Sequence, residues 1–245
     1  MSFLTAVWRV AVGGDKDVAA GQKALGQIHR LLTEAMWKHN GAPRALTLEQ
    51  IAPIRAICDQ LSAANFRLKA PSSELKRSRH VHYQHVYEDD TFSIGIFILP
   101  PGVRIPLHDH PGMSVISRVL YGSVHVKAYT LVQRCAEASD RKYVARLCVD
   151  QVATAPYTTE VLPDRGNVHE FIGGDDIGCA VLDIITPPYD SNKGRDCTYF
   201  RVLDSIVNAD NSSSEGRVVL EPYEPIDFDV VPEDYRGPQL QSQVR

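Results

Sequence analysis

Two short stretches decide the fold expected of this chain: GVRIPLHDH at residues 102–110 and PDRGNVH at residues 163–169. Both begin with glycine or proline, which favour turns, and both end in histidine. His108 and His110 lie two positions apart, so on an extended strand both imidazoles project from one face. His169 follows its own turn and lies on a later strand. Three neutral nitrogen donors with open positions beside them suit a divalent first-row metal that also binds another molecule.

The whole chain has the composition of an ordinary globular protein. Its 245 residues are enough for one substantial core, and they are 44% hydrophobic and 23% charged, with a net charge of −4. The lack of a basic excess argues against a nucleic-acid-binding protein. No apolar run has the length of a membrane span, and the brief apolar run before Arg9 lacks the order of a signal peptide. We therefore expect no nucleic-acid or membrane partner.

Cysteine usage indicates a reducing compartment. The chain has five cysteines, an odd number, and they are widely spaced without a CxxC pair. This pattern disfavours both a disulfide scaffold and a zinc knuckle. We expect a monomer in the cytoplasm, the nucleus or both.

Helical periodicity is confined to the first part of the chain. Apolar residues recur at helical spacing over residues 22–39, and the pattern ends at Asn40-Gly41. In a second helix, Thr47 and Gln50 have the spacing of a capping box, but Pro53 would then lie deep inside it, so a start near Pro53 is the alternative. We predict a helical appendage over residues 1–70 that packs on residues 71–245, giving a single structural unit.

Short strands between glycine- and proline-bearing turns fill the rest of the chain, with no helices between them. They are predicted at residues 82–87, 92–99, 115–121, 123–129, 145–149, 159–162, 170–172, 179–185 and 200–207. This pattern of short strands separated by turns is typical of an antiparallel sandwich or barrel. A polar loop begins at residue 210, and we expect the proline-rich tail after it to pack across the barrel.

A second HxH pair shows that this spacing alone is weak support for a metal site. His80 and His82, with His85 nearby, lack flanking turns and are interpreted as surface or half-buried strand residues. The pair at His108 and His110 differs because glycine and proline precede it. Gly122 closes this motif at a predicted hairpin.

The paired motifs resemble those of the cupin superfamily, whose double-stranded β-helix, or jelly-roll, barrel holds a metal at its mouth. The resemblance implies a mainly β barrel with N-terminal helices. Many cupins carry a glutamate ligand seven residues before the closing glycine, and that position here is Val115. Valine cannot bind a metal, and it also replaces the cysteine of free-cysteine dioxygenases. The expected ligands are therefore His108, His110 and His169 alone.

Five ordered motifs resemble the plant cysteine oxidase and cysteamine dioxygenase family. They are SIGIF at 93–97, IPLHDHPGM at 105–113, LYGSVHVK at 120–127, LDIITPPY at 182–189 and CTYFR at 197–201, and DYRGP at 234–238 fits as well. The resemblance implies a non-haem Fe(II) enzyme that adds both atoms of O2 to a thiol and forms a sulfinic acid. The donor set alone also fits zinc or nickel, although zinc has no redox chemistry.

The same resemblance implies roles for three further residues. Asp183, in an otherwise apolar strand, would orient the substrate amine or accept its proton; the alternative is a structural aspartate that holds a ligand histidine. Tyr189 follows two prolines and would lie near the substrate, or else serve in packing. Cys197 matches a cysteine of the family and is the weakest candidate, because most buried cysteines are inert. Asp109 is interpreted as a turn residue or a support behind the ligands.

The family divides between two substrates, protein N-terminal cysteine and cysteamine, and both carry an amine two carbons from a thiol. No arginine is identifiable as a carboxylate ligand, which disfavours free cysteine, with Arg104 and Arg118 left open. The preferred hypothesis is oxidation of Cys-initiating proteins or peptides by O2, serving oxygen sensing and the hypoxia response through an N-degron pathway. The alternative is cysteamine oxidation to hypotaurine. A metal-free cupin binding module is the alternative of another class.

Overall fold

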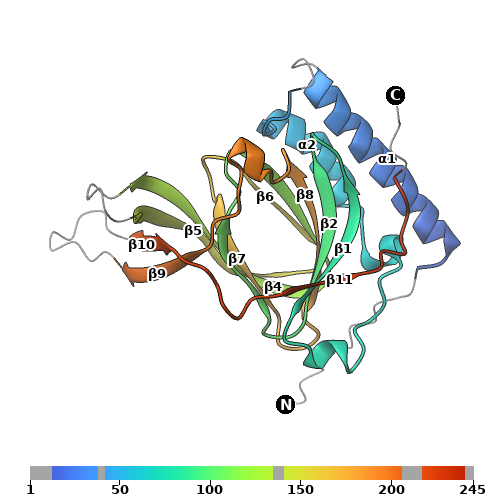
Figure 1. Cartoon of the computed structure of the whole chain (residues 1–245). Helices are drawn as coiled ribbons and strands as arrows, with labels where there is room; N and C mark the ends of the chain where they lie inside the picture. Colours follow the sequence, from blue (N-terminus) through green and yellow to red (C-terminus); the bar gives the residue numbers. More distant parts are fainter. Residues whose placement is uncertain (1–12, 38–41, 135–140, 206–216, 241–245) are drawn as a thin grey trace, which may run out of the picture.

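The computed structural model describes residues 13–37, 42–134, 141–205 and 217–240 (Figure 1). Its helices are α1 (Asp15–Trp37) and α2 (Leu48–Cys58), with 3-10 turns η1 (Ala63–Phe66), η2 (Leu75–Arg77) and η3 (Ser191–Lys193). Its strands are β1 (Val81–Glu88), β2 (Ser93–Leu99), β3 (Arg104–Asp109), β4 (Ser114–Arg134), β5 (Tyr143–Thr154), β6 (Tyr157–Val161), β7 (Val168–Gly173), β8 (Cys179–Thr186), β9 (Phe200–Ser205), β10 (Arg217–Pro222) and β11 (Val230–Glu233). No helix in these ranges is long and apolar enough to cross a membrane.

Two curled sheets share strand β4. The first has the order β11-β1-β2-β8-β4-β6, and the second has the order β3-β7-β4-β5-β10-β9. All these pairs are antiparallel except β1 with β11. The predicted fold class, a mainly β jelly-roll barrel of the cupin type with N-terminal helices, is confirmed. The ends of β5, β9 and β10 extend beyond the barrel on the side away from α1 (Figure 1).

Strand β4 passes from one sheet to the other without a turn. Its first half pairs with β8 and β6, and its second half pairs with β7 and β5. Gly122 lies at the crossing with φ of +71°, and a Cβ there would lie 1.9 Å from the carbonyl oxygen of Gly178. The predicted hairpin at Gly122 is therefore wrong, as are the separate strands 115–121 and 123–129. The glycine bends one continuous strand because only a residue without Cβ fits so close to another backbone.

The helices α1 and α2 cover the outer face of the first sheet (Figure 1). One apolar cluster contains fully buried residues of both helices and of β2 and β8, among them Leu25, Ile28, Ile54, Ile96 and Leu182. Full burial of one such side chain stabilises the fold by roughly 1.5–3 kcal/mol. The helices and this sheet therefore share a core, while the boundary drawn at residue 70 stays a prediction.

The second helix begins at its capping box. Leu48 is the first helical residue, the Thr47 side chain accepts a hydrogen bond from the Gln50 amide, and the Gln50 side chain accepts one from the Thr47 amide. Pro53 lies inside this helix, so the alternative start near Pro53 is wrong. Proline here removes a single bond to the carbonyl of Glu49 in the first turn, and the reciprocal cap offsets that loss. Helix α1 begins at Asp15, earlier than predicted, and residues 38–39 lie outside the described ranges.

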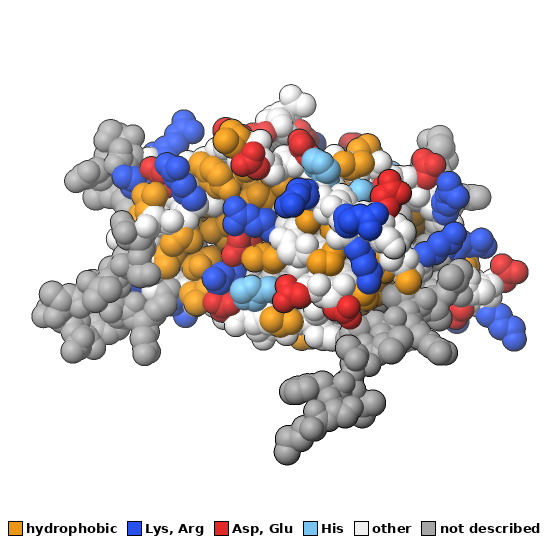
Figure 2. Space-filling view, turned by 90° about the horizontal axis from the view of Figure 1, so that it is seen from below, with side chains coloured by type: hydrophobic (Ala, Val, Ile, Leu, Met, Phe, Trp, Pro, Cys, Tyr) orange, Lys and Arg blue, Asp and Glu red, His pale blue; other side chains and the backbone are white. Residues whose placement is uncertain are grey.

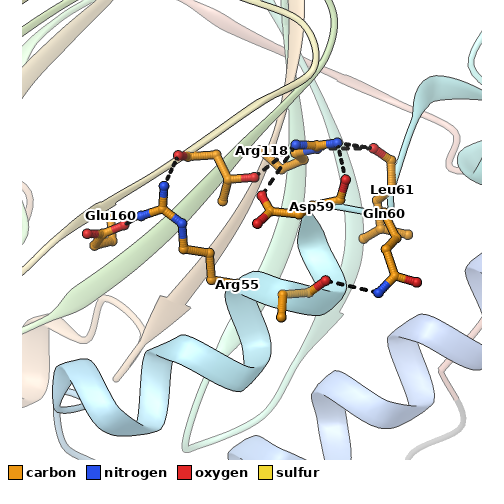
Figure 3. Close-up of polar contacts among 8 residues, drawn as sticks. Arg55, Asp59, Gln60, Leu61, Arg118 and Glu160 are labelled. Atoms are coloured by element: carbon orange, nitrogen blue, oxygen red, sulfur yellow. Dashed lines mark hydrogen bonds and ion pairs between the residues drawn. The ribbon is translucent and has the colours of Figure 1, made fainter.

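Buried Arg118 of β4 connects the barrel to the chain after α2 (Figure 3). Its guanidinium donates to the carbonyl oxygens of Asp59 at 2.7 Å and Leu61 at 3.0 Å, and to Thr158 Oγ1 at 3.0 Å. Beside it, Arg55 of α2 forms an ion pair with Glu160 of β6. These contacts are structural, so Arg118 is not placed to bind a substrate carboxylate.

The expectation that the tail packs across the barrel is confirmed, and the tail also adds two strands that were not predicted. β10 pairs with β5 and β9, and β11 runs parallel to β1. Between them, residues 223–229 cross from the second sheet to the first (Figure 1). The strands escaped prediction because they are short and their sequence is rich in proline and acidic residues, which are depleted in strands. The last part of the predicted strand 200–207 lies outside the described residues.

Candidate metal centre

Three imidazoles meet inside the barrel near the ends of β3 and β7. His108 is the register partner of His169 on the neighbouring strand, and His110 follows directly after β3. The ring centroids of His108 lie 4.9 Å from His110 and 4.8 Å from His169, and those of His110 and His169 lie 4.9 Å apart. One ligand atom of each ring lies within 4.8 Å of the other two. Among the described residues, no other group of three potential metal ligands occurs.

Burial keeps these three imidazoles neutral, as metal binding requires. Desolvation lowers the pKa of His108 to about 4. It also lowers the pKa of His110 and His169 well below the ordinary value, and the neighbouring imidazoles add to the effect. Nε2 of His110 and Nδ1 of His169 are buried without a hydrogen-bond partner, which in native proteins points to an ion or water. The donor set therefore fits a divalent metal.

Hydrogen bonds hold two of the rings in the tautomer that a metal needs. His108 Nδ1 donates to the carbonyl oxygen of Pro106 at 2.8 Å, which leaves Nε2 as the free donor atom. Tyr189 Oη donates to the carbonyl oxygen of Asp109 at 2.7 Å and lies 2.8 Å from His110 Nδ1. Because that hydroxyl proton is engaged, His110 Nδ1 carries its own proton and donates to Tyr189. Nε2 of His110 is then the atom left for the metal.

Asn167 joins the two histidine motifs, although its place in the sequence did not suggest a role. Its side-chain oxygen accepts from the amide of His110 at 3.0 Å, and its amide nitrogen donates to the carbonyl oxygen of His110 at 2.8 Å. Asn167 is buried, so this pair of bonds fixes the backbone that carries His110. The only signal for it was its position between Gly166 and His169 in the second motif.

The position that carries glutamate in many cupins is apolar here. Val115 is buried in a cluster with Met113, Val161 and Ile185, and Tyr189 packs against it. No carboxylate belongs to the histidine group found among the described residues. Three neutral donors leave the full dipositive charge on a bound metal, which favours an anionic ligand such as a thiolate.

Asp183 is a buried carboxylate without a full set of partners. It is 5% exposed, accepts a hydrogen bond from the Ser117 hydroxyl, and has a buried Oδ1 without a partner. Desolvation raises the pKa of Asp183 to about 7. No hydrogen bond joins it to the three histidines, so the structure does not support the alternative of an aspartate that holds a ligand ring.

Asp183 and Tyr189 line one cavity of about 250 Å³, here called the Asp183 cavity. Its wall is mostly apolar and also includes Tyr83, Glu88, Phe97, Pro188 and Val230. Tyr83 packs against Phe97 and lies over Gly95, the register partner of Asp183. A cationic group that enters this cavity meets a wall that includes the buried carboxyl group of Asp183.

Cys197 does not belong to the histidine group. Its thiol is hydrogen-bonded to Tyr189 and Tyr199, and burial raises its pKa to about 11, so it is protonated at neutral pH. Asp109 supports the same segment, because its Oδ1 accepts from the amide of Thr198 at 2.8 Å. The interpretation of Asp109 as a support behind the ligands agrees with this contact.

The histidines of the second HxH stretch lie apart from the triad. His82 is engaged with Ser78 at 2.9 Å and with Glu233 at 2.8 Å, and His80 lies on the surface 3.9 Å from Asp229. His85 is exposed. They form no ligand group with the described carboxylates or thiols.

The barrel and its buried histidine triad define a protein of the cupin class with a site for a metal. A family model described as PCO_ADO matches residues 48–240, and the chain belongs to this family of plant cysteine oxidases and 2-aminoethanethiol dioxygenases. Plant cysteine oxidase 1 of Arabidopsis thaliana is 36% identical over 225 residues, which cover 83% of this chain and 76% of that protein. The 2-aminoethanethiol dioxygenase of Homo sapiens is 30% identical over 261 residues, covering 92% and 88%. The predicted family and the assignment as a dioxygenase are confirmed.

Solved structures of more distant cupins are also similar to part of the chain. An RmlC-like cupin from Shewanella frigidimarina has a TM-score of 0.34 and 18% identity, and the match covers 47% of this chain and 84% of that one. A recombinant oxalate oxidase has a TM-score of 0.33 and 15% identity, with 51% and 57% covered.

Proposed function

We propose that this chain is an Fe(II)-dependent dioxygenase that converts the N-terminal cysteine of proteins and peptides to cysteine sulfinic acid. The reaction adds both atoms of one O2 molecule to the sulfur, so that R–SH becomes R–SO2H. The observation that carries the proposal is the all-histidine triad, which Tyr189 joins to a cavity lined by the buried carboxyl group of Asp183.

His108, His110 and His169 would hold the iron. When bound, it supplies the redox chemistry that O2 requires and a positive charge that favours the thiolate form of the substrate. Tyr189 and the carbonyl of Pro106 keep two of the rings in the binding tautomer. The buried wall around Val115 keeps bulk water away from the reacting sulfur.

Asp183 would bind the substrate amine. An ammonium group two carbons from the sulfur can reach a carboxylate beside the metal, and its charge returns the Asp183 carboxyl to the ionised form. The apolar wall of the cavity, with Phe97, Pro188 and Val230, suits the chain that follows an N-terminal cysteine. Cysteamine has the same amine and thiol without that chain, and it is the second candidate because three relatives are named as 2-aminoethanethiol dioxygenases, one of them as a probable one.

In the cell, we place this activity in oxygen sensing. A monomeric enzyme of the cytoplasm or nucleus would oxidise Cys-initiating proteins in proportion to O2 and pass them to an N-degron pathway in the hypoxia response. Steady-state rates from near-anoxia to air saturation test this role. A rate still rising at air saturation is expected, and a plateau far below it would leave an enzyme without a sensing function.

The substrate test uses intact-mass analysis after aerobic incubation with the iron-loaded protein. A Cys-initiating peptide should gain the mass of two oxygen atoms, whereas the same peptide acetylated at its N-terminus should not. Oxidation of both peptides at equal rates would show that Asp183 does not bind the substrate amine. Oxidation of cysteamine with no oxidation of any peptide would favour the second candidate.

The ligand test replaces each histidine by alanine and measures bound iron by elemental analysis. His108→Ala, His110→Ala and His169→Ala should each lose iron and activity. His82→Ala is the matched control, because it belongs to the other HxH pair and should keep both. An iron content equal to that of the unmodified protein in any of the first three would remove that residue from the ligand set.

A further inference from the structure

A second, larger cavity lies near the lower end of the barrel, and four cations line it. Its volume is about 680 Å³. Its wall consists of η2 and the chain up to β1, the loop before β3, and the crossing segment 223–229, and its charged residues are Lys76, Arg77, Arg79, Arg104, Asp227 and Asp229. We call it the basic cavity. Lys and Arg side chains gather near the middle of the face seen from below (Figure 2).

The four cations have no ion partner of their own. Within the described part of the chain, no ion pair or side-chain hydrogen bond involves Lys76, Arg77, Arg79 or Arg104. Of the two carboxylates, Asp229 lies 3.9 Å from His80 Nδ1. Four cations against two carboxylates leave a local positive excess in a chain whose net charge is −4. Such a cavity attracts carboxylate or phosphate groups.

The basic cavity adjoins the Asp183 cavity along one strand pair. Val81 lines the basic cavity, and its partner in the β1–β11 register is Val230, which lines the Asp183 cavity. Tyr83 of the Asp183 cavity is two residues beyond Val81 on the same face of β1, a separation of roughly 7 Å along a strand. Because an extended chain advances about 3.3 Å per residue, a peptide that passes Tyr83 reaches the cations within a few residues.

We propose that the basic cavity binds acidic side chains of the substrate that lie a few residues after its N-terminal cysteine. This inference rests on the proposed oxidation of Cys-initiating peptides. The guanidinium groups of Arg77, Arg79 and Arg104 would receive the carboxylates, since arginine pairs with them through two parallel hydrogen bonds. Phe228, which also lines the cavity, offers an apolar surface to the intervening residues. The site thus selects among Cys-initiating proteins by the charge of the residues that follow the N-terminal cysteine.

The first experiment compares three peptides of equal length and equal N-terminal sequence. One carries three aspartates at positions 5–7, one carries them at positions 12–14, and one carries glutamines at positions 5–7. We expect kcat/KM to be about three- to ten-fold higher for the first peptide, as expected for two or three exposed ion pairs, and the advantage to shrink in high salt. Equal values for all three peptides would overturn the proposal. Failure to oxidise any of them would instead refute the proposed function.

The second experiment reverses the charge of two arginines that line the basic cavity. In the variant Arg77→Glu/Arg79→Glu, the ratio of kcat/KM for the acidic over the glutamine peptide should fall to about one or below. Arg79→Gln, the milder change, should lower the ratio part of the way and serves if the double variant fails to fold. Lys23→Glu is the matched control, because Lys23 is exposed on α1 on the outer side of the barrel and should leave the ratio unchanged.

A small-anion site is the competing interpretation. Inorganic phosphate at constant ionic strength should inhibit oxidation of the acidic peptide more than that of the glutamine peptide. If phosphate binds and inhibits both peptides equally, the cavity takes free anions and has no role in reading the peptide. An undiminished acidic preference in the double variant would also overturn the assignment.

Discussion

The phenol oxygen of Tyr189 lies 2.8 Å from Nδ1 of His110, and its proton is engaged by the carbonyl of Asp109. A residue expected near the substrate is therefore also a support for a metal ligand. One side chain lines the Asp183 cavity and fixes the tautomer of a ring in the triad. Its two roles can be separated experimentally.

Removing the Tyr189 hydroxyl should weaken metal binding. In Tyr189→Phe, His110 Nδ1 and the Asp109 carbonyl lose their partner, and the ring is free to rotate or change tautomer. We expect a loss of about 10–100-fold in metal affinity, the usual effect of removing such a support. Competition titration with a chelating dye measures it. Tyr235→Phe is the control, because Tyr235 Oη donates only to the backbone oxygen of Pro238; equal metal affinity in both variants would contradict the role.

The buried carboxyl of Asp183 should make stability depend on pH. Its pKa is raised from 3.8 to about 7, so the folded protein binds more protons than the unfolded chain between these values. The contribution of this carboxyl to the free energy of unfolding is fully present below pH 3.8, and it is lost as the pH rises to about 7. Asp183→Asn should remove that dependence, which is worth on the order of a few kcal/mol.

Denaturant unfolding of the metal-free protein at several pH values measures this effect. The difference in unfolding free energy between Asp183→Asn and the unmodified protein should grow with pH across this interval. A difference that stays constant would mean that the carboxyl is solvated. With iron bound, the same variant should keep its metal while turnover of a Cys-initiating peptide falls. Loss of the metal would instead make Asp183 a structural support.

A methyl group at Gly95 should disturb the wall of the Asp183 cavity. A Cβ there would lie 2.3 Å from the ring of Tyr83, so the ring must move. Overpacking of this kind costs about 1–3 kcal/mol. Gly95→Ala should lower the melting temperature and lower kcat/KM for peptides. Gly26→Ala is the control, because its Cβ would meet nothing within 4 Å on an exposed helix face, and it should stabilise α1 slightly.

Loss of the Arg118 guanidinium should loosen the helices from the barrel. Arg118→Met leaves the buried carbonyl of Leu61 and the partly buried carbonyl of Asp59 without these donors, at a cost of about 2–4 kcal/mol. Hydrogen exchange should then increase in α2 before it increases in β4 or β8. Arg201→Met removes an exposed pair with Glu221 and should change stability by about 0–1 kcal/mol. Uniform exchange throughout the Arg118 variant would show that helices and barrel unfold together.

Local sequence patterns located both helices and most strands, and they singled out the three histidines as the candidate ligand set. Apolar spacing located both helices, and alternation between glycine and proline turns located most strands, because these patterns depend on neighbours within a few residues. Spacing and turn context separated His108 and His110 from the second HxH pair. Val115 excluded a carboxylate ligand at its position, because a valine side chain has no donor atom.

Tertiary structure alone decided how these parts meet. Gly122 looks like a turn in sequence, yet it bends one strand because Gly178, more than fifty residues later, approaches its backbone. Pro53 looks like a helix start, yet the cap at Thr47 outweighs it. The contact of Tyr189 with His110, the unpaired oxygen of Asp183 and the cations around the basic cavity all join distant segments. Periodicity carries no information about such pairs, because only the packing of the two sheets and the crossing segment 223–229 brings them into contact.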